Sequence, residues 1–66
     1  MPRKPTVLIN FLRDVERGIT VKEAKEKYGN MIYNYHYSGF VDREGDKFVL
    51  TEKGREALKK YGGEDA

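Results

Sequence analysis

Apolar residues recur with helical spacing in the first third of the chain. Along residues 7 to 15 they fall three and four positions apart, which places them on one side of a helix. These residues are Val7, Leu8, Phe11, Leu12 and Val15. Thr6 can cap such a helix, and Gly18 follows where a left-handed residue commonly ends one. The pattern therefore predicts an amphipathic helix between Thr6 and Gly18.

A second helix is predicted directly after the first. Residues 20 to 23 read TVKE, a capping box in which the Thr20 hydroxyl accepts from the Glu23 N–H and the Glu23 side chain reaches back. The apolar positions that share one face are Val21, Ala24 and Tyr28. We expect Glu23 and Lys27, four positions apart, to form an ion pair. Gly29 is expected to end this helix.

A short third helix is predicted in the next segment. Asn30 can cap it and Gly39 can end it, which leaves room for about two turns. Helical spacing turns Ile32 and Tyr35 toward the core. The residues expected to face outward are Tyr33, Asn34 and Tyr37.

The last third of the chain changes to strand periodicity before a final helix. Phe40 and Val41 begin one strand, the charged stretch DREGDK forms a turn centred on Gly45, and KFVL alternates as a second strand. Thr51 can cap the helix that follows. Its expected inner face consists of Ala57, Leu58 and Tyr61. The pattern predicts an antiparallel hairpin followed by a fourth helix.

The length of 66 residues allows one domain. We expect a flexible N-terminal arm over 1–5, where two prolines flank Arg3 and Lys4, a single domain over 6–63 and a disordered tail over 64–66. Cysteine is absent, and no apolar run is long enough to span a bilayer. No signal peptide is recognisable, so we expect a cytoplasmic location.

Residues that support catalysis or hold metals are scarce. His36 is the single histidine, and no histidine or cysteine pair has metal-binding spacing. The glycines lie at helix ends and in the hairpin turn, not in a phosphate-binding loop. The acidic residues Asp42, Glu44 and Asp46 fit a solvated turn. We therefore expect no enzymatic activity, no cofactor, no metal and no small-molecule substrate.

The order helix, bridge, helix, helix, hairpin, helix resembles the winged-helix family, as found in small archaeal and bacterial regulators. The segments GITVKEAKEKYG, SGFVDREGDKFVLT and LTEKGREAL carry the resemblance, which covers nearly the whole chain after residue 5. It implies an α+β, winged helix-turn-helix-like fold, with three helices, a two-stranded antiparallel wing and a C-terminal helix.

The winged-helix resemblance also implies DNA binding through the third helix. No cation lies between Lys27 and Arg43, although Lys and Arg contacts to phosphates supply most non-specific DNA affinity. The candidate DNA contacts are Lys22, Lys25, Arg43 and Lys47 for phosphates, and Asn30 or Asn34 for an adenine. Under this alternative the chain is a DNA-binding transcriptional regulator.

The stretch of residues 30–40 favours a protein partner instead, because it has no Lys, Arg, Asp or Glu. Tyrosine is enriched at protein interfaces, and charged residues are depleted from their centres. Tyr33, Asn34 and Tyr37 are therefore candidate partner-binding residues. The alternative is that several of these tyrosines belong to the core.

A second candidate contact lies in the segment KPTVLINFLRD, residues 4 to 14. Leu8, Phe11 and Leu12 resemble the hydrophobic plug of peptides that bind the DNA sliding clamp, although Pro5 stands where those peptides carry glutamine. The same spacing is also ordinary core packing, and both interpretations stay open.

In its size and in this segment, the chain resembles small archaeal inhibitors of the sliding clamp. This clamp is the proliferating cell nuclear antigen. We therefore expect a non-catalytic, protein-binding regulator that acts on a factor of DNA metabolism. The sliding clamp is the candidate partner, and duplex DNA is the alternative one.

Overall fold

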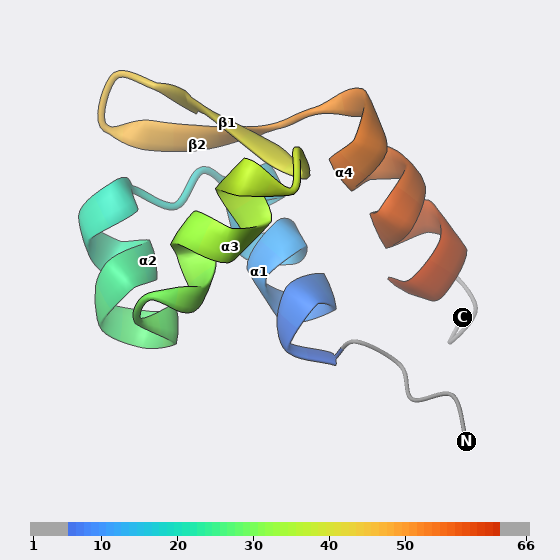
Figure 1. Cartoon of the computed structure of the whole chain (residues 1–66), viewed down its shortest axis with the longest axis horizontal. Helices are drawn as coiled ribbons and strands as arrows, with labels where there is room; N and C mark the ends of the chain where they lie inside the picture. The colour runs from blue at the N-terminus through green and yellow to red at the C-terminus, as the bar shows by residue number, and fades with distance from the viewer. Residues whose placement is uncertain (1–5, 63–66) are drawn as a thin grey trace.

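The computed structural model describes residues 6–62, which form an α+β fold (Figure 1). Four α-helices and one two-stranded antiparallel sheet make up this part of the chain. In chain order the elements are α1 (Thr6–Arg17), α2 (Val21–Tyr28), α3 (Met31–Tyr37), β1 (Val41–Glu44), β2 (Lys47–Leu50), α4 (Glu52–Ala57) and a π-helical segment, η1 (Leu58–Gly62). The predicted α+β class is confirmed. The expected arm over 1–5 and tail over 64–66 lie outside the described residues.

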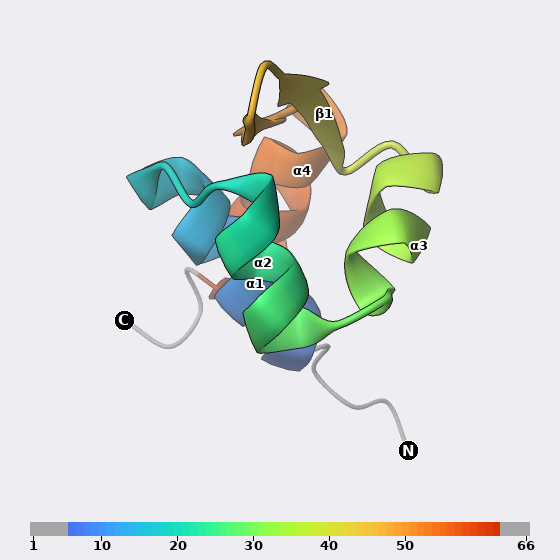
Figure 2. The same cartoon turned by 90° about the vertical axis from the view of Figure 1, so that its left-hand side faces the viewer.

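Helix α1 runs through the middle of the molecule. It contacts β2, α4 and η1, while α2 and α3 contact each other and lie on the opposite side from α4 (Figures 1 and 2). The hairpin lies across one end of the helices, where β1 contacts α3 and β2 contacts α1. Helix α3 is thus packed against its neighbours on one side only, and its other side lies at the surface.

One aromatic ring on α1 contacts three other elements. The ring of Phe11 stacks on Tyr35 of α3, with 5.3 Å between the centroids. It also meets Tyr28 of α2 and Phe48 of β2 edge to face, at 5.3 and 5.6 Å. Phe11 and Phe48 both belong to one buried cluster. The buried members of this cluster are Leu8, Phe11, Leu12, Val15, Ala24, Ile32, Val41, Phe48 and Ala57.

The buried face of α1 is turned slightly from the predicted one. Ile9 is buried, whereas Val7, which we expected on the inner face, keeps 42% of its surface exposed. Both residues lie at the edges of the apolar arc, so periodicity alone does not decide between them. On the Val7 side, α1 faces Tyr28 and Met31 across an open pocket, which leaves Val7 in contact with solvent.

Local signals explain where α2 begins and ends. The Glu23 N–H donates to Thr20 Oγ1 at 3.1 Å, and the Thr20 N–H donates to Glu23 Oε1 at 3.2 Å, so the predicted capping box is confirmed. Gly29 ends the helix with a φ of 69°, a conformation that costs glycine little. The predicted pair of Glu23 with Lys27 is replaced by another: Lys27 Nζ lies 2.7 Å from Oδ2 of Asp14 on α1.

The predicted side-chain cap of α3 by Asn30 is wrong. Asn30 precedes the helix, but its side chain makes no capping hydrogen bond. The physical reason is its backbone, with φ −72° and ψ −9°, which is already helical. A capping side chain reaches the first turn from an extended backbone, as Thr20 and Thr51 have.

The hairpin turns around Gly45, as predicted, although its first strand begins at Val41 and does not include Phe40. Its pairs run from Val41 with Leu50 to Glu44 with Lys47, which leaves a two-residue turn. Gly45 adopts a φ of 65° there, as such turns require at their first position. The turn is joined to the start of α2, because the Val21 N–H donates to the Asp46 carbonyl at 2.7 Å.

The last helix starts at Thr51 as predicted. Its Oγ1 accepts from the Gly54 N–H at 3.1 Å and donates to the Gly39 carbonyl. The expected inner face is confirmed, since Ala57 is buried and two half-buried residues, Leu58 and Tyr61, pack against the core. The helix continues beyond Ala57 as the wider π-helical segment η1.

None of the helices between residues 6 and 62 has both the length and the apolar composition that crossing a membrane requires.

Candidate functional site

Helix α3 presents tyrosines on its outward side. Ile32 is fully buried and holds the inner side of the helix in the core. Tyr33 and Tyr37 follow at positions one turn apart, and 42% and 91% of their surfaces are exposed. Asn34 lies between them on the helix surface and is also exposed. We call Tyr33, Asn34 and Tyr37 the outward face of α3, and its predicted orientation is confirmed.

The end of α3 is held in place by contacts of His36. The His36 ring meets Phe48 edge to face at 6.2 Å between centroids, and its Nε2 lies 3.7 Å from Oδ1 of Asp42 on β1. On the other side it lies nearly parallel to the Tyr37 ring at 6.3 Å. Ile32 and Tyr35 pack the inner side of the same helix against the core. The tyrosines of the outward face therefore project from a helix whose position is fixed.

The segment after α3 is fastened to α4. Lys53 Nζ donates to the Ser38 carbonyl at 2.7 Å and lies 4.8 Å from the centroid of the Phe40 ring. Thr51 donates to the Gly39 carbonyl. These contacts satisfy carbonyl groups at the C-terminal end of α3, which would otherwise need water or another donor.

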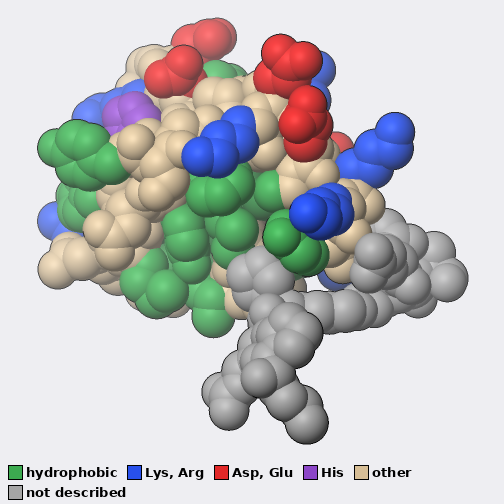
Figure 3. Space-filling view, turned by 45° about the vertical axis from the view of Figure 1, so that its right-hand side comes forward, with side chains coloured by type: hydrophobic (Ala, Val, Ile, Leu, Met, Phe, Trp, Pro, Cys, Tyr) green, Lys and Arg blue, Asp and Glu red, His purple; other side chains and the backbone are tan. Residues whose placement is uncertain are grey.

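Exposed apolar side chains concentrate on α3. Among the described residues, the large hydrophobic side chains with substantial exposure are Val7, Met31, Tyr33 and Tyr37, and three of the four belong to α3. Single exposed apolar residues are common on proteins, but grouped ones mark interaction surfaces. Figure 3 shows another face, turned toward α4, where hydrophobic side chains also gather and acidic side chains lie along one edge.

The structure places the clamp-plug candidates in the core. Leu8, Phe11 and Leu12 are all buried, and each belongs to the central cluster. A partner reaches them only if α1 leaves the core. Of the two interpretations of this spacing, core packing describes the folded domain, and these residues are not part of its surface.

The candidate DNA contacts are all exposed, and acidic residues lie among those of the hairpin. Lys22 and Lys47 come from the same end of the molecule, because Lys47 forms a bridge with Thr20 beside the start of α2. Arg43 donates from Nε to the carbonyl of Gly45 in its own turn, at 3.0 Å. The basic set Lys22, Lys25, Arg43 and Lys47 and the amides Asn30 and Asn34 are all exposed. The hairpin also carries exposed acidic residues, Asp42, Glu44 and Asp46, which oppose phosphate binding.

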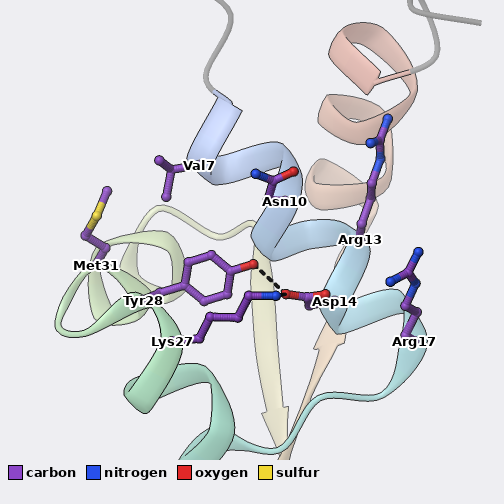
Figure 4. A pocket seen from close by; sticks show the side chains of 8 residues that line it. All are labelled: Val7, Asn10, Arg13, Asp14, Arg17, Lys27, Tyr28 and Met31. Atoms are coloured by element: carbon purple, nitrogen blue, oxygen red, sulfur yellow. Dashed lines mark hydrogen bonds and ion pairs between the residues drawn. The ribbon is translucent and has the colours of Figure 1, made fainter.

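A pocket between α1, α2 and the start of α3 was not predicted (Figure 4). It has a volume of about 500 Å³. At its centre, Oδ2 of Asp14 accepts hydrogen bonds from Lys27 Nζ at 2.7 Å and from the Tyr28 hydroxyl at 2.5 Å. No local sequence pattern predicts this contact, because Asp14 and Tyr28 lie 14 positions apart on different helices. The residues that line the pocket are Val7, Asn10, Arg13, Asp14, Arg17, Lys27, Tyr28 and Met31.

The contacts in this pocket shift two ionisable groups. The hydrogen bonds from Lys27 and from Tyr28 hold the pKa of Asp14 below its ordinary value of 3.8. Burial, followed by the hydrogen bond to the Asp14 carboxylate, raises the pKa of Tyr28 well above its ordinary value of 10. At neutral pH the carboxylate is therefore charged and the phenol is neutral.

Residues 6–62 contain no cluster of three or more histidine, aspartate or glutamate residues placed to hold a metal ion. Within the same range, every buried side-chain nitrogen and oxygen has a hydrogen-bond partner. Comparison of the chain with known protein families, with curated proteins and with solved structures gives no match.

Proposed function

We propose that this chain is a non-catalytic regulator that binds a protein partner through the outward face of α3. The observation that supports this most directly is the exposure of Tyr37, at 91% of its surface, on a helix without Lys, Arg, Asp or Glu. Tyrosine offers a large, rigid ring at small entropic cost and a hydroxyl that stays hydrated at the rim. Tyr33 extends the same surface by one helical turn.

The proposed partner is a factor of DNA metabolism. This part rests on the resemblance of the chain to small winged-helix regulators, in which α2 and α3 would form the helix-turn-helix and β1–β2 the wing. The order and packing of the elements are compatible with that arrangement. The sliding clamp is the first candidate, with inhibition as the proposed outcome. Because the plug residues are buried, we expect any such contact to use α3.

Affinity capture tests this proposal. The tagged chain is incubated with extract from the source cells, with and without nuclease, and the captured proteins are identified. The double variant Tyr33→Ala, Tyr37→Ala should lose the partner, since aromatic hot spots cost at least about 2 kcal/mol each when truncated. A matched variant, Lys59→Ala and Glu56→Ala, changes exposed residues near the other end of the chain and should retain it.

The outcome is decisive if binding and folding are measured separately. Both double variants should melt within a few degrees of the unchanged chain, because exposed substitutions alter stability by only about 0.5 kcal/mol. Purified sliding clamp is then titrated directly by calorimetry. Equal capture by the two double variants would rule out the outward face of α3 as the docking surface.

The second candidate function is binding of duplex DNA. The observation in its favour is the bridge between Thr20 and Lys47, which brings Lys47 of the hairpin beside the start of α2, where Lys22 lies. The acidic hairpin residues and the absence of Lys and Arg from α3 predict weak binding that falls steeply with salt. Fluorescence anisotropy at physiological salt tests it. Sequence-selective binding in the nanomolar range, lost in Lys22→Ala and Lys47→Ala, would make DNA the ligand instead.

A further inference from the structure

The pocket between α1, α2 and α3 holds an excess of positive charge. Its lining contains three basic side chains, Arg13, Arg17 and Lys27, and one acidic side chain, Asp14.

The single acidic residue of the pocket is already neutralised. Asp14 accepts from both Lys27 and Tyr28 on the same oxygen. An incoming cation would have to displace Lys27 from that carboxylate. An anion instead gains from the remaining positive field, which Arg17 supplies from the exposed end of α1.

The opposite side of the pocket is apolar. Val7 and Met31, with 42% and 43% of their surfaces exposed, lie on the side away from Arg13 and Arg17, and the Tyr28 ring lies between the two sides (Figure 4). Methionine is enriched at protein interfaces, where its flexible side chain adapts to the partner. The pocket therefore offers an apolar contact and a cationic contact next to each other.

We propose that this pocket binds an acidic peptide segment of the protein partner. A large apolar side chain of the segment lies between Val7 and Met31, and a neighbouring carboxylate lies beside Arg17 and Lys27. This inference rests on the proposed function. Met31 of the pocket and Asn34 of the outward face are three positions apart on α3, so they are adjacent on its surface. The pocket and the outward face of α3 form one continuous docking area.

Two other occupants fit the lining less well. Small-molecule sites are mostly apolar with a few polar groups, whereas most of the residues that line this pocket are polar or charged. Nucleic acid would place phosphates against two apolar side chains, Val7 and Met31. An acidic and apolar peptide satisfies both sides of the pocket.

Titration with defined peptides tests the proposal. The probe is a nonapeptide, acetylated and amidated at its ends, with glutamates on both sides of a central leucine. One control replaces the glutamates by glutamine, and another replaces the leucine by glycine. The methyl resonances of Val7 and Met31 report binding by NMR. The probe should shift both and bind on the order of tenfold more tightly than either control, with affinity that falls as salt rises.

Variants locate the binding site. Arg17→Gln and Met31→Ala, both at exposed positions, should each weaken binding of the probe on the order of tenfold. Lys59→Gln, an exposed lysine on η1, serves as the matched control and should leave it unchanged. Equal binding of the glutamate and glutamine peptides would overturn the proposal. So would shifts of Val7 and Met31 with a duplex of about 15 base pairs but not with the probe.

The two proposals can fail separately. If Tyr33→Ala and Tyr37→Ala abolish capture of the cellular partner while Arg17→Gln and Met31→Ala do not, the pocket is not used and the proposed function stands. If the peptide binds the pocket but the tyrosine variants capture the partner normally, the outward face of α3 is not the docking surface and the proposed function fails.

Discussion

The hydroxyl of Tyr28 donates a hydrogen bond to the carboxylate of Asp14, with 2.5 Å between the two oxygens. Lys27 donates to the same carboxylate oxygen at 2.7 Å. The two contacts join the last turn of α2 to the middle of α1. Because Asp14 has only 15% of its side chain exposed, its charge is shielded from water and depends on these donors.

The first prediction concerns acid. The folded pKa of Asp14 lies below its ordinary value of 3.8, so the charged form stabilises the fold above that value. This contribution is lost as the pH falls through the folded pKa. We expect Asp14→Asn to lower the melting temperature at about pH 7. The difference from the unchanged chain should shrink as the pH is lowered from about 7 through the folded pKa, because Asp14 then becomes protonated in the unchanged chain as well.

Thermal melts followed by circular dichroism across this pH range measure the effect. Glu16→Gln is the matched control, since it removes an exposed carboxylate from the same helix. Its melting temperature should stay close to that of the unchanged chain throughout. If the melting temperatures of Asp14→Asn and the unchanged chain differed by the same amount at every pH, the loss of stability would come from the shape of the side chain and not from its charge.

The second prediction compares two aromatic residues. Phe11 is fully buried and contacts three other rings, whereas Tyr37 is almost fully exposed. Phe11→Ala should lower the free energy of unfolding by about 3–5 kcal/mol. That is a large share of the roughly 5–15 kcal/mol that stabilises a typical domain. Tyr37→Ala should change it by no more than about 0.5 kcal/mol. Urea unfolding measures both, and similar values for the two variants would contradict the assignment of core and surface.

Much of the fold could be predicted because its signals are local. The capping box at Thr20 and the turn at Gly45 each depend on residues within four positions of one another. Helical periodicity also predicted which side of α3 faces outward, since the burial of Ile32 fixes the direction of its neighbours.

Other features could not be predicted because they depend on packing between distant segments. The spacing of Leu8, Phe11 and Leu12 is compatible with a core face and with a clamp-binding plug, and the position of α1 among its neighbours decides between them. The link from Asp14 to Tyr28 has no sequence signature, because side chains on two helices meet only once the helices are packed. The pocket that they form remained hidden for the same reason.

The third prediction concerns the cap of α2. Thr20 Oγ1 accepts from the Glu23 N–H, which has no partner within the helix. Thr20→Ala should therefore reduce the free energy of unfolding by about 1 kcal/mol. Thr20→Ser keeps the hydroxyl and should recover most of that loss. Urea unfolding of the two variants gives the comparison, and equal losses would mean that the methyl group of Thr20, not its hydrogen bond, matters.

The fourth prediction concerns the contact of α4 with the segment before β1. A Cβ at Gly54 would lie 2.0 Å from the carbonyl oxygen of Phe40, and 3.3 Å from a methyl carbon of Leu50. The Phe40 carbonyl cannot move freely, because it accepts a hydrogen bond from the Thr51 N–H at 3.2 Å. Gly54→Ala must therefore push α4 away from the hairpin.

Alanine normally favours a helix over glycine by about 1 kcal/mol, so an unobstructed site would gain stability. At Gly54 we expect a loss of about 1–3 kcal/mol or more, because overpacking outweighs the gain in propensity. Glu56→Ala, at an exposed position of the same helix, controls for propensity and should stay within about 0.5 kcal/mol. Thermal and urea unfolding measure both variants. A Gly54→Ala variant as stable as the unchanged chain would mean that α4 does not approach the Phe40 carbonyl this closely in solution.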